Sequence, residues 1–309
     1  MVRSLLTLCL VCLAAGYAHG EARTRATLNG DLTPVYFNDG DSFKVIGGVG
    51  TRARLQGFNT LESYGPVHQW GGWTYRELLV IAKLGTKNGQ KGTWSCTSDM
   101  ATDTYGRALF ECPELRLSQL RKGLAHAMTV TAEPAAQELL DAQDEAKREG
   151  RGMWAHGDPE WILTSLHSHA EKPHKPYAYN RVVSSVDGHS ELWRHRDNYA
   201  ECEEVCVDNV TISEGTFRSS NQALRDNPVL DEIWGELSRD HRRLTLRVWL
   251  MLGSVASIVP EASRAALAEG LRALEADGTL RAETRTRASC SVYVDYKRRF
   301  GGNRAKCLK

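Results

Sequence analysis

The chain lacks an excess of charge of either sign. Its 309 residues include 39 Lys and Arg against 38 Asp and Glu, which gives a formal net charge of +1 at pH 7. Strong basicity is the usual electrostatic signature of a protein that binds nucleic acid over a wide surface, and the sequence excludes it. An enzyme that grips one or two phosphates locally stays compatible with this composition.

Hydrophobic runs long enough to span a membrane are missing after the N-terminal segment. The nearest is residues 244–260, LTLRVWLMLGSVASIVP, where Arg247 interrupts the run and indicates a buried helix instead. At the N-terminus, Arg3 precedes an apolar run over residues 5–15, and small residues follow it. This pattern is typical of a secretory signal peptide cut before Glu21, the alternative being an uncleaved N-terminal anchor. The sequence therefore predicts a secreted or periplasmic protein without stable membrane insertion.

Cysteines are few once the signal peptide is removed. The remaining ones are Cys96, Cys112, Cys202, Cys206, Cys290 and Cys307. An even number in an exported chain favours disulfides over metal ligands. Cys96 and Cys112 flank a predicted hairpin, and the other four lie in the C-terminal half, where they can pair among themselves. A zinc site built from those four is the alternative, which export disfavours.

The length and the 41% hydrophobic content favour two globular domains. We expect a signal peptide over residues 1–20, a first domain over 21–155, a linker over 156–180 and a second domain over 181–309. The linker is rich in His, Pro and Lys, a composition typical of a solvated segment. Adventitious metal binding by its histidines is the alternative, which their spacing does not favour.

Strand and helix signals alternate in the first domain. Turn residues punctuate short β-like runs over residues 26–58, and two more strands are predicted over 92–112 around a polar loop. Helices are predicted over 73–85 and 117–128, and a third opens after Pro134 and stops near Gly150. We therefore expect an α+β fold, and a small closed barrel of the OB type is one solution among several small α+β folds.

The second domain is predicted to be mainly helical and to contain disulfides. Its clearest helical runs cover residues 227–255 and 260–278, and no motif in it names a function. The tail from Arg285 onward is basic. It either touches a polyanion or is a solvated end pinned by Cys290 and Cys307.

Two clusters of polar residues in the first domain supply metal-binding and phosphate-binding groups. Asp39 and Asp41 flank a glycine at a tight turn and supply hard oxygen ligands, although Asp-Gly is also a plain hairpin signal. In RLQGFNTLE, residues 54–62, the guanidinium of Arg54 can fork onto a phosphate. Asn59 and the carbonyl of Thr60, in the same stretch, can bind a hard cation.

Two further residues supply catalytic groups. Glu62 ends the same stretch and can orient or deprotonate a water molecule. In TDTYGRALF, residues 102–110, Arg107 follows a turn and precedes a strand, from where a guanidinium can reach a pentavalent phosphorus. Taken singly, these clusters are indistinguishable from surface charge.

Taken together and in this order, the clusters resemble the staphylococcal nuclease (thermonuclease) family over about residues 26–155. The matches also include LRKGLAHA and the final EAKREGRGMWA. The resemblance implies an OB-type five-stranded barrel. It also implies a phosphodiesterase that acts on DNA and RNA and depends on Ca²⁺ rather than Mg²⁺.

The resemblance assigns a role to each matching residue. Asp41 matches the main calcium-binding aspartate, Asp39 the acidic residue before it, and Thr60 the residue that lends a carbonyl to the metal. Glu62 matches the carboxylate that acts on water. The phosphate-binding arginines correspond to Arg54 and Arg107, and substrate-side residues of the loop correspond to Asp103 and Tyr105.

Three residues depart from the family pattern. Asn59 replaces a second calcium-binding aspartate, which removes one negative charge and predicts weaker metal affinity. Leu61 replaces a proline and loosens the turn that aims Glu62. Thr129 falls near the position where the family has a tyrosine that stacks on the substrate. In this fold Cys96 and Cys112 lie on neighbouring strands, so a disulfide between them is expected to brace the loop of Arg107.

Three functions follow as hypotheses. The first is a secreted metal-dependent nuclease. The second is a nucleic-acid- or protein-binding module that kept the barrel and lost catalysis. In the third, the C-terminal half binds a partner or attaches to a surface, with the nuclease as its payload.

Overall fold

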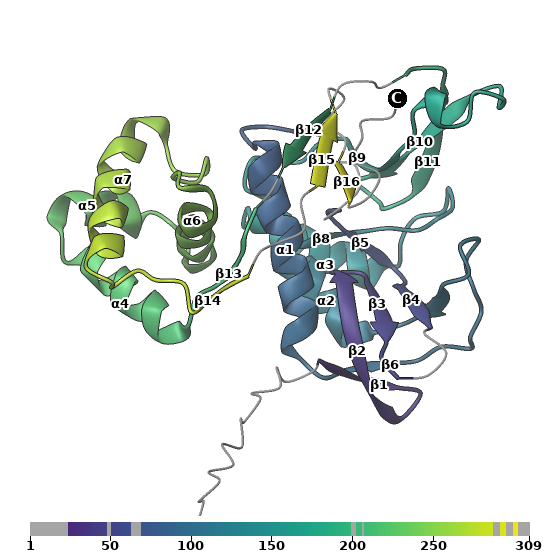
Figure 1. Ribbon diagram of the computed structural model, residues 1–309, viewed down its shortest axis with the longest axis horizontal. Helices are drawn as coiled ribbons and strands as arrows, with labels where there is room; N and C mark the ends of the chain where they lie inside the picture. The colour runs from purple at the N-terminus through teal and green to yellow at the C-terminus, as the bar shows by residue number, and fades with distance from the viewer. Residues whose placement is uncertain are drawn as a thin grey trace, which may run out of the picture.

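The computed structural model describes residues 24–47, 51–62, 69–198, 202–205, 207–286, 291–294 and 299–301. Within these ranges the protein is mixed α and β, with seven helices and a curled β-sheet (Figure 1). The helices are α1 (Tyr75–Lys91), α2 (Pro113–Arg121), α3 (Gln137–Arg148), α4 (Glu214–Arg225), α5 (Pro228–Gly235), α6 (Arg239–Leu252) and α7 (Glu261–Ala276). Figure 1 places α4–α7 on one side of α1 and the curled sheet on the other.

The curled sheet has the strand order β6-β1-β2-β3-β4-β7. Its strands are β1 (Arg25–Leu28), β2 (Asp31–Asp39), β3 (Ser42–Val45), β4 (Arg52–Leu55), β6 (Trp94–Cys96) and β7 (Ala108–Phe110). The two edge strands meet just beyond their ends, where Thr97 and Glu111 exchange main-chain hydrogen bonds of 2.9 and 2.8 Å. The Cys96–Cys112 disulfide lies beside this bridge, with its Cα atoms 4.2 Å apart, so that predicted pair is confirmed.

Helix α1 packs against the inside of this sheet. It begins where the sequence predicts, because Thr74 and Glu77 form a capping box that satisfies the first main-chain N–H groups. The helix continues past the predicted end at Gly85, through Lys91. Gly85 and Gly89 allow close packing, since an added Cβ on Gly89 would stand 2.8 Å from the ring of Phe37.

The predicted helix over residues 117–128 is only partly correct. Pro113 starts α2 earlier, at a position where its missing N–H costs nothing, and Gly123 ends it with a φ of +61°. The residues after Gly123 form β8 (Ala125–Ala127), which pairs with β5 (Phe58–Thr60). The last predicted helix ends where expected, because α3 stops at Arg148 and Gly150, with a φ of +58°, follows two residues later.

The expected linker over residues 156–180 differs most from the structure. Strand β9 (Trp161–Leu166) lies within it, and β10 (Ala178–Ser184) begins there; with β11 (Ser190–His195) they form a three-stranded sheet. Alternate residues of β9 are buried, the period-2 pattern of a half-buried strand, which the abundant His, Pro and Lys of the segment conceal. This sheet is tied to the first domain by main-chain hydrogen bonds, including Thr129 to Gly188 at 2.8 Å.

The rest of the chain is helical with short strands. The predicted helix over 227–255 is two helices, because Ser238 caps α6 at its start. Helix α6 contains Arg247 and packs against α1. The short strands are β12 (Cys202–Val205), β13 (Asn209–Thr211), β14 (Thr284–Thr286), β15 (Ser291–Val294) and β16 (Arg299–Gly301).

Several predictions fall outside the described residues. They are the signal peptide over 1–20, the side chain of Cys202, and Cys206, Cys290 and Cys307. Most of the basic tail also falls there. In the part of the chain that is described, no helix combines the length and the apolar character that crossing a membrane requires.

Candidate functional site

The centre of the candidate site is the carboxylate of Asp41, at the turn between β2 and β3. Its Oδ2 accepts hydrogen bonds from the main-chain N–H of Thr60 at 2.8 Å and from the Thr60 hydroxyl at 3.2 Å. Its Oδ1 forms a salt bridge with Arg54, and only 1% of the side chain is exposed. Gly40 makes the tight turn possible, since an added Cβ would stand 2.5 Å from the Thr60 side chain.

Arg54 joins Asp41 to β5. Its second terminal nitrogen donates to the side-chain oxygen of Asn59 at 2.7 Å, and lies 3.5 Å from the carbonyl of Phe58. The amide nitrogen of Asn59 then donates to the carbonyl of Thr60 at 2.8 Å. It also faces the Nε2 of the buried His126 at 3.4 Å. The amide orientation of Asn59 is therefore set from both ends, with its oxygen toward the guanidinium.

Asp39 and Glu62 add negative charge to this cluster. Asp39 accepts a hydrogen bond from the Ser42 hydroxyl at 2.6 Å. Burial raises the pKa of Asp39 well above its ordinary value of 3.8, and the nearby charges of Asp41 and Glu62 raise it further. Burial lowers the pKa of Arg54, but the same three carboxylates outweigh this effect and the pKa is raised. Three carboxylates thus surround one guanidinium, which leaves an excess of negative charge.

Asp103 organises the loop that carries Arg107. Its carboxylate accepts hydrogen bonds from the main-chain N–H groups of Tyr105 and Arg107, both at 2.9 Å, and from the Arg107 side chain at 2.7 Å. Burial raises the pKa of Asp103, but these hydrogen bonds outweigh burial and the pKa is lowered. The guanidinium of Arg107 also lies 5.6 Å from the ring centre of Tyr105. Asp103 therefore holds Arg107 in place.

A hollow of about 550 Å³ brings Arg107 and Asp39 to one surface. Tyr36, Lys44 and Arg52 also line it, as cross-strand neighbours on β2, β3 and β4. We did not predict these three residues from the sequence. The alternation of side chains along a strand could have indicated them, because Arg52 stands two residues before Arg54 and so lies on the same face of β4.

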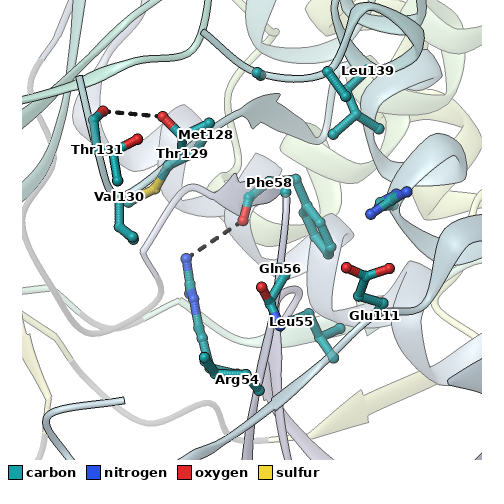
Figure 2. A pocket seen from close by; sticks show the side chains of 15 residues that line it. Arg54, Leu55, Gln56, Phe58, Glu111, Met128, Thr129, Val130, Thr131 and Leu139 are labelled. Carbon is teal, nitrogen blue, oxygen red and sulfur yellow. Dashed lines mark hydrogen bonds between the residues drawn. The ribbon is translucent and has the colours of Figure 1, made fainter. Parts of the chain in front are cut away.

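A second hollow, of about 340 Å³, opens beside Arg54 (Figure 2). Its walls are mostly apolar, with Phe58, Leu139 and Met128 among them, and Arg54 reaches in from β4. Thr129, on the same wall, donates its hydroxyl to the carbonyl of Thr131 at 3.1 Å, and a threonine has no ring on which a base could stack. The volume is at the lower end of the range for small-molecule pockets.

The β9–β11 sheet touches the loop of Arg107. Tyr179 on β10 is hydrogen-bonded to Tyr105, and burial followed by this contact raises the pKa of Tyr179. Arg52 donates to the main-chain carbonyl of Tyr105 at 2.8 Å from the other side. The loop is therefore held by Tyr179, by Arg52 and by the Cys96–Cys112 disulfide. Of these three, the sequence indicated only the disulfide.

The donor atoms fit a hard divalent cation. Asp39 and Asp41 offer carboxylate oxygens, Asn59 an amide oxygen and Thr60 a main-chain carbonyl, all of them ligand types that Ca²⁺ takes. Burial is the largest cause of the raised pKa of Asp39, and the charges of Asp41 and Glu62 add to it; a bound cation would offset that second cause. Within the described ranges, no group of three or more His, Cys, Asp or Glu side chains is arranged to hold a metal. The predicted calcium ligands include only two side chains of these types, Asp39 and Asp41.

The geometry thus brings Asp41, Arg54, Asn59 and Thr60 into direct contact and puts Asp39 and Glu62 within electrostatic range of Arg54. Arg107 and Asp39 both line the first hollow, and Asp103 and Tyr105 lie on the loop of Arg107. No protein-family model matches this chain, and no curated protein matches it.

Proposed function

We propose that the protein is a secreted, Ca²⁺-dependent nuclease that hydrolyses phosphodiester bonds of DNA or RNA, on an OB-type barrel of the staphylococcal nuclease family. The observation that carries the proposal is the buried contact network of Asp41, Arg54, Asn59 and Thr60. The meeting of β6 and β7 at Thr97 and Glu111 supports barrel closure.

Each residue has a separate task in this proposal. Glu62 takes a proton from the attacking water, which adds to phosphorus while the bond to the leaving nucleoside oxygen breaks. Arg54 and Arg107 donate hydrogen bonds to the phosphate oxygens, where charge builds up in the transition state. The contacts of Arg54 with Asp41, Asn59 and Phe58 use three of its five N–H groups, which leaves two for substrate.

Ca²⁺, when bound by Asp39, Asp41, Asn59 and the Thr60 carbonyl, supplies positive charge that offsets the charge of the phosphodiester. Arg54 and the Thr60 N–H hold the carboxylate of Asp41 in its orientation for this purpose. Asn59 brings one charge fewer than an aspartate, so we expect a high Ca²⁺ requirement.

The second candidate is a binding module without catalysis. It is favoured by one observation: the amide oxygen of Asn59 and both carboxylate oxygens of Asp41 already accept hydrogen bonds inside the protein. Such a network is stable without a metal. A hydrolysis assay separates the two candidates.

The test uses the mature protein from Glu21 with single-stranded DNA, duplex DNA and RNA, each with Ca²⁺, Mg²⁺ or a chelator. Arg107→Ala and Glu62→Gln each lower the rate about a hundredfold or more, since each removes one transition-state contact or the general base. Arg194→Ala is the matched arginine control, because Arg194 lies on β11 and stacks on Tyr177, the residue before β10. Binding without cleavage under every metal would reject the nuclease and favour the binding module.

A further inference from the structure

A cavity of about 350 Å³ lies between α1 and α6, and we call it the seam pocket. It shares no lining residue with either hollow of the candidate site. Five cationic side chains line it: Lys87, Lys91, Lys122, Arg243 and Arg247. Its only carboxylates are those of Glu214 and Asp240, so the lining carries an excess of three positive charges.

The positions of these cations are costly for the two helices. Lys87 and Lys91 stand four residues apart on α1, and Arg243 and Arg247 stand four apart on α6. Like charges at this spacing on a helix repel each other and destabilise it. Two such pairs also face the same cavity, in a chain whose overall charge is nearly balanced.

The carboxylates of the seam pocket do not neutralise it. Glu214 is shared between Arg239 and Arg243 at the start of α4. Within the described ranges, Lys91 and Arg247 have neither a hydrogen-bond acceptor nor an ion-pair partner. Burial lowers the pKa of Arg247, and Arg243 lowers it further.

Lys91 reports the same excess of positive charge, whereas at Lys122 the charge of Asp240 opposes the effect of burial on the pKa. Burial lowers the pKa of Lys91, and Arg247, Lys122 and Arg243 then lower it further. Burial also lowers the pKa of Lys122, whose amino group donates to Asn88 at 2.5 Å and to Ser118 at 3.0 Å. These partners are neutral and position the ammonium without cancelling its charge.

We infer that the seam pocket binds a phosphate-bearing anion through Lys91, Lys122 and Arg247. A phosphate group offers several oxygens to converging cations and would relieve the repulsion between α1 and α6. The ligand is either a small phosphorylated molecule or one segment of a nucleic-acid backbone, and both present the same chemistry. Because α1 belongs to the first domain and α6 to the second, the ligand also stabilises the contact between them.

The test measures binding of pyrophosphate to the mature protein by calorimetry and thermal melting, with chelator present. We expect saturable binding and a raised Tm. The Lys91→Gln/Arg247→Gln variant loses about tenfold or more in affinity, because it removes two charge-assisted contacts. Arg107→Ala serves as the control for phosphate bound at the candidate active site, and Arg194→Gln as the control for a lost surface charge.

A parallel titration with a thymidine oligonucleotide identifies the source of the phosphate. If the seam variant also loses oligonucleotide affinity, the ligand is a strand backbone; if it loses only pyrophosphate, the ligand is a small molecule. The single Lys91→Gln variant keeps the test valid if the double variant does not fold. Absence of saturable pyrophosphate binding, or binding that Arg107→Ala abolishes and the seam variants leave unchanged, would overturn the inference.

Discussion

Removal of the Cys96–Cys112 disulfide by a Cys96→Ala/Cys112→Ala variant should destabilise the protein strongly. The bond closes a loop with a sequence separation of 16 residues. The loss of loop constraint in the unfolded chain corresponds to about 3 kcal/mol for a loop of this length. At about 2.1 cal/mol/K of unfolding entropy per residue, a chain of 309 residues loses about 1.5 °C of Tm per kcal/mol, which gives a fall of about 5 °C.

The structure adds a functional consequence to this loss. The closed loop contains Tyr105 and Arg107, and its two ends are joined by the Thr97–Glu111 bridge. Without the disulfide the loop gains freedom, so we expect cleavage to fall along with stability. Urea unfolding and calorimetry measure the first effect, and the hydrolysis assay measures the second.

A control variant separates this effect from general damage to β6. Ser95→Ala changes an exposed residue of the same strand, and it should alter stability by no more than about 0.5 kcal/mol. An unchanged urea midpoint in the double cysteine variant would refute the idea that the disulfide constrains this loop.

Three further predictions concern stability. Because folding raises the pKa of Asp39, the wild type loses stability as pH rises through the raised pKa of the folded state. Without Ca²⁺, the Asp39→Asn variant should therefore be more stable than wild type at pH 7 and equally stable near about pH 3. Urea midpoints at the two pH values measure the difference. Glu77→Ala should cost about 2–3 kcal/mol in urea unfolding, since buried Glu77 caps α1 and accepts the Ser257 N–H at 2.6 Å; no loss would contradict this joint between α1 and the helical half. Gly123→Ala should lower Tm much more than Gly106→Ala, because both glycines have positive φ but only at Gly123 would an added Cβ meet a main-chain oxygen, at 2.0 Å; equal losses would contradict the steric argument.

Local chemistry made much of the first domain predictable. The Asp-Gly-Asp turn, the start of α1 and the pairing of Cys96 with Cys112 were all indicated by short segments of the sequence. The contacts of Asp41 with Arg54 and Thr60 agree with the cluster indicated by the sequence. The partners in the Asp41–Arg54, Cys96–Cys112 and Asp41–Thr60 contacts are 13, 16 and 19 positions apart in the sequence, so the motifs indicated them and adjacency did not.

Tertiary contacts decided the features that the sequence did not indicate. β8 forms after Gly123 because β5 offers it a partner, although its residues favour a helix when considered alone. β9 is stabilised by β10, which is separated from it by a segment with turn composition. Tyr179 and Arg52 reach the loop of Arg107 from distant parts of the chain, and no spacing in the sequence reports such contacts.

The most direct test of the nuclease proposal is the rate of single-stranded DNA cleavage by the mature protein, with Ca²⁺ and with chelator, for wild type and Glu62→Gln. The proposal predicts cleavage only with Ca²⁺, and a rate lowered about a hundredfold or more in Glu62→Gln. Glu138→Gln, a change in the first turn of α3, should behave as wild type. Equal rates for wild type and Glu62→Gln, or no cleavage with any metal, would contradict the assignment of the Asp41–Arg54 cluster as a phosphodiesterase site.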